Sequence, residues 1–319
     1  MSTSAGTSRR DLGATGLSVT PICWGTSPLA SMARLYGYAV EEEQAVATVR
    51  AAFDSPVNFL DTSNGYGEDG TSERRIGAAI RQAGGLPDGV VLATKVDPDP
   101  RTGDFGGDRV RASLEESMER LGVDKVALLH LHDPERISFE EGVAPGGPLQ
   151  ALVDLRERGL VEHLGVAGGP VGLLQQYLDT GEFEVVLSHN RYTLLDRSAE
   201  ALFRGAAERG LGVLNAAPYG GGMLSKGPGV QQKYAYGAPD DRVRQAAETM
   251  EAACRRHGVP LAAAALQFSL RAEMVTSTVV GVSSPQRVEQ TLELAAVAVP
   301  DELWDELEQA VPTRDLWLD

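Results

Sequence analysis

The sequence predicts an α/β protein: a (β/α)8 TIM barrel with an N-terminal β-hairpin and extra C-terminal helices. Strand-like and helix-like segments alternate along nearly the whole chain, eight strand-like runs occur, and polar groups stand where several of them stop. Alternation predicts a parallel sheet with right-handed crossovers. Eight such units predict closure into a barrel, whereas an open doubly wound sheet, the alternative, usually has fewer strands.

The first half of the chain contains a hairpin and four of the expected strands. After a short polar start, the hairpin is expected around residues 13–19. Residues 41–53 and 110–121 repeat apolar side chains three and four positions apart, which predicts helices. The expected strands are PICWGT, NFLDTS, VVLATKV and VALLHLH, at residues 21–26, 58–63, 90–96 and 126–132.

The second half repeats the scheme. A helix near 148–158 is expected to end before Gly159, because glycine is the usual residue just past a helix. Two long irregular segments, 27–40 and 219–240, are expected on the face where the strands end. No linker interrupts the chain, so we expect one domain spanning 1–319. The remaining strands are expected at HLGVAG, EVVLSHN, GVLNAAP and STVVGVS, residues 163–168, 184–190, 212–218 and 277–283.

The composition restricts the partners. The 319 residues carry a formal charge of −16, which disfavours nucleic acid and anionic membranes and leaves a small molecule as the expected partner. No apolar run approaches the roughly 20 residues of a membrane span, so we expect a cytoplasmic protein. Cys23 and Cys254 are interpreted as buried thiols. The histidines and carboxylates do not fall at metal-ligand spacings, so no metal is expected. The oligomeric state stays open.

Polar side chains stand where three successive strands are expected to end. Asp61 and Tyr66 follow the second strand, Lys95 lies near the end of the third, and the fourth ends at His132. The carboxyl ends of the strands form the face of a barrel that carries the chemistry. These four residues are therefore expected to converge into one catalytic group.

Tyr66 is expected to move a proton. The pKa of a free phenol is about 10, and a nearby ammonium such as that of Lys95 is expected to lower it. Asp61 is the partner that a buried lysine needs, and His132 is expected to hydrogen-bond a substrate oxygen. Tyr66 then acts as a general acid toward a carbonyl or as a general base toward an alcohol. His130 is interpreted as a packed core residue.

From about Arg10 to Leu292 the chain resembles an aldo-keto reductase. The segments that carry the resemblance are FLDTSNGYGEDGTSERRIG, ATKV, LLHLHDPE and GLVEHLGVAG. They are similar to the family's aspartate–tyrosine segment, lysine strand, histidine strand and approach to the nicotinamide site. The resemblance implies a (β/α)8 barrel that exchanges hydride with NAD or NADP. It implies a cofactor extended across the barrel mouth, without a Rossmann domain.

The resemblance also implies a cofactor site, with departures from the family pattern. Ala167 stands where the family often has a serine, and Ala216 where many members have an aromatic ring. Gly281 replaces a lysine that often contacts the 2′-phosphate, while Arg287 stands where an arginine often reaches it; this leans slightly to NAD. The run GGGML is expected to offer backbone amides to the pyrophosphate. The implied cofactor-binding residues are Gly25, Thr26, Asp61, Ala167, Asn190, Pro218, Tyr219, Gly220, Gly221, Gly222, Leu224, Gly281, Ser283, Arg287 and Gln290.

Within the family, NRYTLLD (190–196) and AAPYGGGML (216–224) resemble the branch of aldose 1-dehydrogenases, L-fucose dehydrogenases and pyridoxal dehydrogenases. That resemblance implies oxidation of an aldose or cyclic hemiacetal to a lactone. Substrate contacts are expected from Trp24, Tyr66, His132 and Tyr219. The alternatives are an NADPH-dependent reductase of aldehydes and ketones, a slow-turnover cofactor-sensing subunit, and a barrel with unrelated chemistry such as a lyase.

Overall fold

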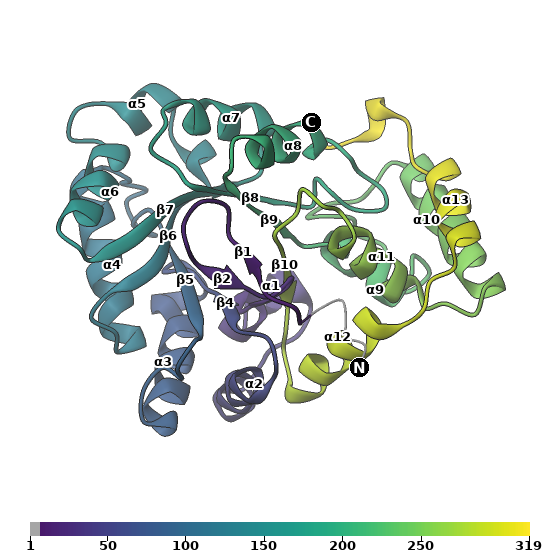
Figure 1. Ribbon diagram of the computed structural model, residues 1–319, viewed down its shortest axis with the longest axis horizontal. Helices are drawn as coiled ribbons and strands as arrows, with labels where there is room; N and C mark the ends of the chain where they lie inside the picture. The colour runs from purple at the N-terminus through teal and green to yellow at the C-terminus, as the bar shows by residue number, and fades with distance from the viewer. Residues whose placement is uncertain (1–6) are drawn as a thin grey trace.

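The computed structural model describes residues 7–319 (Figure 1), and it contains the predicted barrel. Eight parallel strands close in the order β10-β3-β4-β5-β6-β7-β8-β9. Each of them lies in or overlaps a run predicted from the sequence. The strands are β3 (Ile22–Gly25), β4 (Phe59–Asp61), β5 (Val91–Val96), β6 (Val126–His132), β7 (Val161–Gly168), β8 (Val185–His189), β9 (Gly212–Ala216) and β10 (Ser277–Gly281).

The N-terminal hairpin is also present, and it closes one end of the barrel. Strands β1 (Arg10–Asp11) and β2 (Ser18–Val19) pair antiparallel. Leu12 is fully buried and packs among the inward-facing side chains of the barrel. Gly13 has a positive φ, and a Cβ there would lie 2.4 Å from the Gly212 backbone nitrogen, so only glycine allows this close approach. Access to the barrel interior is therefore confined to the opposite mouth.

The outer layer is helical, and additional helices extend it (Figure 1). No helix in residues 7–319 is long and apolar enough to cross a membrane. The thiols of Cys23 and Cys254 are both buried and unbonded, as expected. The α-helices are α1 (Ala33–Tyr36), α2 (Glu42–Asp54), α3 (Thr71–Ala83), α4 (Gly107–Leu121), α5 (Phe139–Val143), α6 (Pro148–Glu157), α7 (Val171–Asp179), α8 (Glu200–Glu208), α9 (Met223–Lys226), α10 (Asp241–Arg256), α11 (Leu261–Leu270), α12 (Pro285–Ala296) and α13 (Asp301–Gln309). The short 3-10 turns are η1 (Ser27–Ala30), η2 (Glu68–Gly70), η3 (Pro134–Arg136), η4 (Gly220–Gly222) and η5 (Arg314–Leu316).

The barrel interior changes from apolar to polar toward its open mouth. Because side chains alternate along a strand, Leu128, His130 and His132 share the inner face of β6. His130 is fully buried, and it fits because the neighbouring strand has Gly165, where a Cβ would lie 2.2 Å from its Nδ1. Burial, and then the Lys95 charge, lower the pKa of His130 well below its usual value, so the imidazole is neutral. The prediction that it is a core residue is confirmed.

Candidate active site

Lys95 is the centre of the predicted catalytic group. Its Nζ donates to Asp61 Oδ2 at 2.7 Å, to the Thr62 carbonyl at 2.6 Å and to Tyr66 Oη at 3.1 Å. Lys95 and Asp61 are 1% and 2% exposed. An ammonium has three protons to donate, and all three are used here. The amine is therefore fixed in position, and it holds the phenol of Tyr66 at the mouth of the barrel.

The pKa of Tyr66 differs from the sequence-based expectation. Burial, and then the negative charge of Asp61, raise it well above the usual phenol value. The expected lowering of the Tyr66 pKa is therefore wrong, although the Lys95 ammonium lies 4.7 Å from the ring centroid. Tyr66 is a neutral phenol, which is the form that donates a proton.

His132 has a partner that the sequence analysis missed. Its Nδ1 lies 2.7 Å from Asp97 Oδ1 and 3.0 Å from Ser63 Oγ. The other Asp97 oxygen accepts from the Gly65 backbone N–H at 2.7 Å and from Ser63 Oγ. A signal for this pair was present: Asp97 is two residues beyond Lys95, so it continues the same face of β5 past the end of the strand.

The two members of this pair stabilise each other's charge. Burial alone raises the pKa of Asp97, but the charge and hydrogen bond of His132 outweigh it and lower the pKa to about 2. Burial alone lowers the pKa of His132, but the carboxylates of Asp97 and Asp133 outweigh it and leave the pKa raised. The environment therefore favours an imidazolium beside Tyr66.

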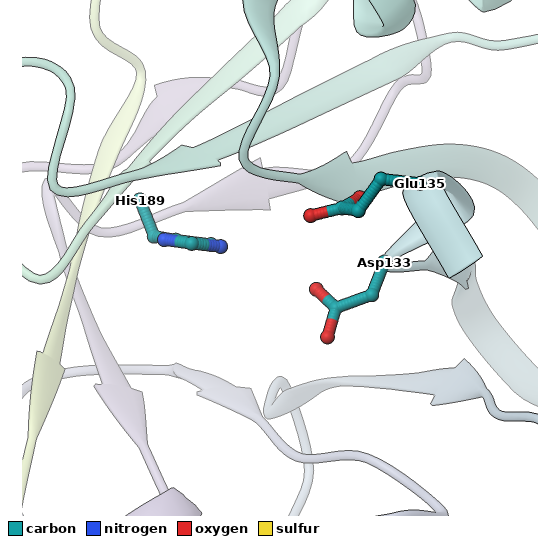
Figure 2. A group of neighbouring side chains, drawn as sticks. All are labelled: Asp133, Glu135 and His189. Carbon is teal, nitrogen blue, oxygen red and sulfur yellow. The ribbon is translucent and has the colours of Figure 1, made fainter. Parts of the chain in front are cut away.

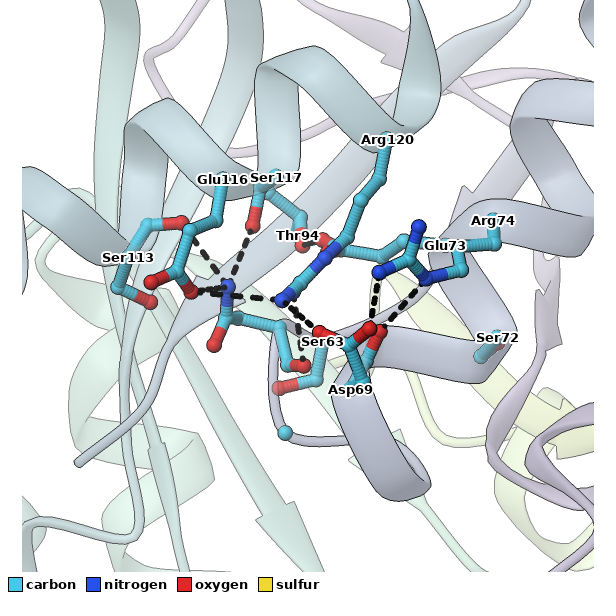
Figure 3. Close-up of polar contacts among 12 residues, drawn as sticks. Ser63, Asp69, Ser72, Glu73, Arg74, Thr94, Ser113, Glu116, Ser117 and Arg120 are labelled. Carbon is cyan, nitrogen blue, oxygen red and sulfur yellow. Dashed lines mark hydrogen bonds and ion pairs between the residues drawn. The ribbon is translucent and has the colours of Figure 1, made fainter. Parts of the chain in front are cut away.

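A polar network behind the site holds the loop that carries Tyr66 (Figure 3). Asn64 donates to Glu116 Oε2 at 3.0 Å, which ties the loop to α4. From the same helix, Arg120 lies 3.3 Å from Glu73 Oε2, and the Glu73 side chain is fully buried. Burial raises the pKa of Glu73, while Arg120 acts in the opposite direction. The loop that carries Tyr66, and the helix α3 that follows it, are therefore both tied to α4 by polar contacts outside the cavity.

Tyr66 and its neighbours line a cavity of about 820 Å³ at the barrel mouth, and the two irregular segments form part of its wall. Tyr36 lies on the first segment, and Tyr236 on the second. Most of the predicted site residues line this cavity. They are Gly25, Asp61, Tyr66, Lys95, His132, Ala167, Tyr219, Gly221, Gly222, Gly281, Ser283, Arg287 and Gln290.

Trp24 is a correction. It was expected to contact substrate, but it is 1% exposed and packs with the core residues between the barrel and α2. Its Nε1 donates to Ser55 Oγ at 3.1 Å. Gly25 faces the cavity, and neighbouring strand residues face opposite sides, so Trp24 faces outward. It supports the barrel wall and does not contact the cavity.

Five predicted cofactor residues lie behind the cavity wall and do not line it: Thr26, Asn190, Pro218, Gly220 and Leu224. Thr26 Oγ1 donates to the Asp61 carbonyl at 2.9 Å, so it supports the strand that ends at Asp61. The backbone N–H groups of Gly220 and Leu224 donate to the Ala217 and Tyr219 carbonyls. These two amides are already paired, so they are not available to the pyrophosphate, whereas the same expectation for the Gly221 amide stays a prediction.

The fold also assembles a cluster that the sequence spacing did not indicate (Figure 2). Asp133, Glu135 and His189 each bring one polar atom within 4.8 Å of the others, and all three line the cavity. Asp133 lies 3.6 Å from His132 Nε2. Burial lowers the pKa of His189 to about 4, so it is neutral. Such a set could hold a cation, and it also offers hydrogen-bond acceptors next to the predicted catalytic group.

Comparison with known proteins identifies the family. The sequence profile of the aldo/keto reductase family matches residues 21–312. The chain belongs to this family. It is therefore an NAD(P)-dependent oxidoreductase, and the predicted resemblance is confirmed.

Named relatives agree with the predicted branch. The chain is 32% identical to a D-threo-aldose 1-dehydrogenase of Pseudomonas, with 94% of this chain and 97% of the relative covered. It is 34% identical to the L-galactose dehydrogenase of Arabidopsis thaliana, covering 96% and 95%. It is 29% identical to a pyridoxal 4-dehydrogenase of Microbacterium luteolum, covering 94% and 96%. An aldo-keto reductase from Bacillus halodurans, solved in its holo form, has the same fold, with a TM-score of 0.78, 22% identity and coverage of 96% and 97%.

Polar atoms left without partners fit the cofactor that this family uses. Within the described residues, Asp61 Oδ1 and Tyr219 Oη are buried and have no hydrogen-bond partner. Both residues line the cavity. A buried polar atom without a partner is costly, and the hydroxyl groups of a nucleotide can supply the missing bonds. The residues present therefore fit a nicotinamide nucleotide.

The network behind Tyr66 leads to a prediction about stability. We expect Arg120→Met to lower the free energy of unfolding by about 3 kcal/mol, because it leaves the Glu73 carboxylate buried without its cation. Urea unfolding would measure this. The loss should shrink as the pH falls and Glu73 takes up a proton. In the matched control Arg74→Met, an ion pair with Asp69 that is largely exposed is removed, so we expect a change below about 0.5 kcal/mol. Equal losses in the two variants would contradict the assigned role of the network.

Proposed function

We propose that this enzyme oxidises the anomeric carbon of an aldose, or the hemiacetal carbon of a related cyclic compound, to give a lactone. This proposal rests on the set of hydrogen-bond acceptors that lies beside His132. Asp133, Glu135 and His189 line the cavity, and sugar hydroxyls are donors that such groups bind. The two carboxylates would repel phosphorylated or acidic sugars. The activities named for the relatives, on aldoses, L-galactose and pyridoxal, support the same substrate class.

The proposed chemistry uses the four residues at the barrel mouth. When bound, the nicotinamide takes up or supplies the hydride. Tyr66 Oη exchanges a proton with the substrate oxygen, and Lys95 holds the phenol in place through a 3.1 Å hydrogen bond. Asp61 balances the charge of Lys95. His132 orients the substrate oxygen toward Tyr66.

The proposed preference for NAD over NADP rests on the adenosine end of the cavity. Gly281, Ser283 and Arg287 line this part of the cavity, with Arg287 in the first turn of α12. A 2′-phosphate is bound most strongly where several cations surround it. Here Arg287 is the single cation among these three residues, and Gly281 offers no second one, so this end of the cavity favours NAD over NADP.

The experiment that tests the proposal is an assay of purified enzyme for reduced nicotinamide. NAD and NADP would be supplied separately with fucose, arabinose, galactose or pyridoxal. We expect formation of reduced nicotinamide with at least one aldose, and a higher kcat/KM with NAD. A signal with NADP alone would overturn the cofactor preference. If no sugar or hemiacetal reacts while simple aldehydes consume NADH or NADPH, the proposed substrate class is wrong.

One observation favours carbonyl reduction as a second candidate function. The raised pKa of Tyr66 keeps the phenol protonated, and a protonated phenol is the form needed to reduce a carbonyl. Oxidation requires the same group to accept a proton, so its rate should rise with pH. The two candidates are separated by comparing kcat/KM for an aldose in the oxidising direction with kcat/KM for a simple aldehyde in the reducing direction. An oxidation rate that did not rise with pH would weaken the assignment of Tyr66 as the base.

The role of Tyr66 gives a direct prediction. We expect Tyr66→Phe to lower kcat by about 10³-fold, because the group that transfers the proton is removed, with little change in thermal stability or in cofactor affinity measured by fluorescence. The matched control is Tyr177→Phe, which removes a hydroxyl that is buried without a partner on α7 and should leave kcat unchanged. Activity in Tyr66→Phe equal to that of the control would contradict the assignment.

The carboxylate cluster gives a second prediction. We expect Glu135→Ala to raise KM for an aldose by about 10-fold, the effect of losing one hydrogen bond to a charged group, and to leave KM for an unsubstituted aldehyde unchanged. Steady-state kinetics with both substrates would measure this. Glu140→Ala, which removes an exposed carboxylate on α5, serves as the control. A similar rise in KM for both substrates would argue against recognition of hydroxyl groups.

A further inference from the structure

We propose that Asp97 is a positioning residue, which holds His132 with a proton on Nδ1, so that Nε2 donates a hydrogen bond to the substrate oxygen only when the ring is charged. The inference rests on the proposed function, because it assumes that the substrate oxygen meets His132. The state of the ring can nevertheless be tested without any substrate.

The hydrogen bonds of Asp97 determine which nitrogen carries the proton. Asp97 Oδ2 accepts from the Gly65 backbone N–H at 2.7 Å and from Ser63 Oγ. Asp97 Oδ1 faces His132 Nδ1 at 2.7 Å. An ionised carboxylate can only accept hydrogen bonds, so Nδ1 must be the donor. Ser63 Oγ lies 3.0 Å from Nδ1, and because its own proton points to Asp97, it too can only accept from the ring.

This arrangement links the charge of His132 to its ability to donate a hydrogen bond to the substrate. With Nδ1 protonated, a neutral ring has a bare lone pair on Nε2, and it can only accept a hydrogen bond. A charged ring has a proton on both nitrogens and can only donate. A carbonyl oxygen can only accept, so it can bind Nε2 only when the ring is charged. A substrate hydroxyl, whose single proton goes to Tyr66, meets Nε2 in the same way, as an acceptor. The protonation of Nε2 thus decides whether His132 can hold the substrate oxygen next to Tyr66.

The groups around His132 act in opposite directions on its charge, so both the charged and the neutral ring are accessible. Asp97, at the end of β5, and Asp133, 3.6 Å from Nε2, favour the charged ring. Lys95 opposes them, and burial favours the neutral ring. The titratable groups around the ring, from every element packed against it, are Asp61, Tyr66, Lys95, Asp97, His130, Asp133, Glu135 and His189.

Asp97→Asn should reverse the tautomer. The Gly65 N–H can only donate, so the side-chain oxygen of the asparagine is expected to stay on that side. The amide NH₂ then faces His132 Nδ1 and requires it to be an acceptor. The neutral ring would carry its proton on Nε2, and protonation of Nδ1 would be opposed. The same substitution therefore changes two separately measurable properties of His132.

Nitrogen-15 NMR of histidine-labelled enzyme, titrated between about pH 5 and pH 9 without substrate, would measure both properties. In the wild type we expect a neutral form protonated on Nδ1 and a His132 pKa above that of free histidine. In Asp97→Asn we expect protonation on Nε2 and a proton affinity at least 10-fold lower. His132→Gln would assign the signal. The matched control Asp124→Asn, which alters an exposed carboxylate near the start of β6, should titrate like the wild type.

The outcomes separate this inference from the proposed function. A wild-type ring protonated on Nε2 when neutral would overturn the inference, even if Asp97→Asn fails to fold. An unchanged tautomer in a folded Asp97→Asn would also overturn it. In kinetics, the rate of aldehyde reduction by the wild type should fall as the pH rises and His132 loses its proton. This fall in rate should be absent in Asp97→Asn. If the NMR result holds but no carbonyl or alcohol reacts, the positioning role stands and the proposed function fails.

Discussion

The buried ammonium of Lys95 is the interaction on which the rest of the site depends. A buried charge costs several kcal/mol unless it is paired and hydrogen-bonded, and Lys95 is 1% exposed. Asp61 lies opposite Ala93 in the sheet register, so Lys95 extends past the end of β4. Its remaining acceptors must come from the chain that follows β4, and they do: the Thr62 carbonyl and the Tyr66 hydroxyl. The Tyr66 hydroxyl is therefore one of the acceptors that this buried lysine requires.

Asp97 holds the same loop from the other side. It binds the Gly65 N–H, one residue before Tyr66. A Cβ at Gly65 would lie 2.7 Å from the Asp97 carboxyl carbon, so only glycine allows the contact. Two side chains on one face of β5 thus hold the short segment between β4 and Tyr66. Each of them also pairs with an opposite charge on a neighbouring strand, Lys95 with Asp61 and Asp97 with His132.

The barrel, the hairpin and the convergence of Asp61, Tyr66, Lys95 and His132 could be predicted, because each follows from periodicity and from the rule that strand ends share a face. The outward position of Trp24 could also have been found, since it alternates with Gly25. What could not be predicted depended on contacts distant in sequence. The pairing of the Leu224 amide with Tyr219, and the meeting of His189 with Asp133, arise from loop conformations that no local pattern encodes.

Those loop conformations are unfavourable in backbone free energy, and the unfavourable residues are concentrated at the cavity. Asp133, Asn190 and Ala217 follow directly after β6, β8 and β9, and all three have left-handed backbones with φ of 43°, 63° and 55°. A non-glycine residue in this region costs on the order of 1 kcal/mol or more. Asparagine and aspartate tolerate it through local hydrogen bonds, but alanine has no such compensation. The sharp turn after each strand leaves its last inward side chain at the open mouth. These turns thus lower the stability of the fold at the strand ends, where the side chains of the site must face the substrate. The packed barrel below them provides the stability that offsets this loss.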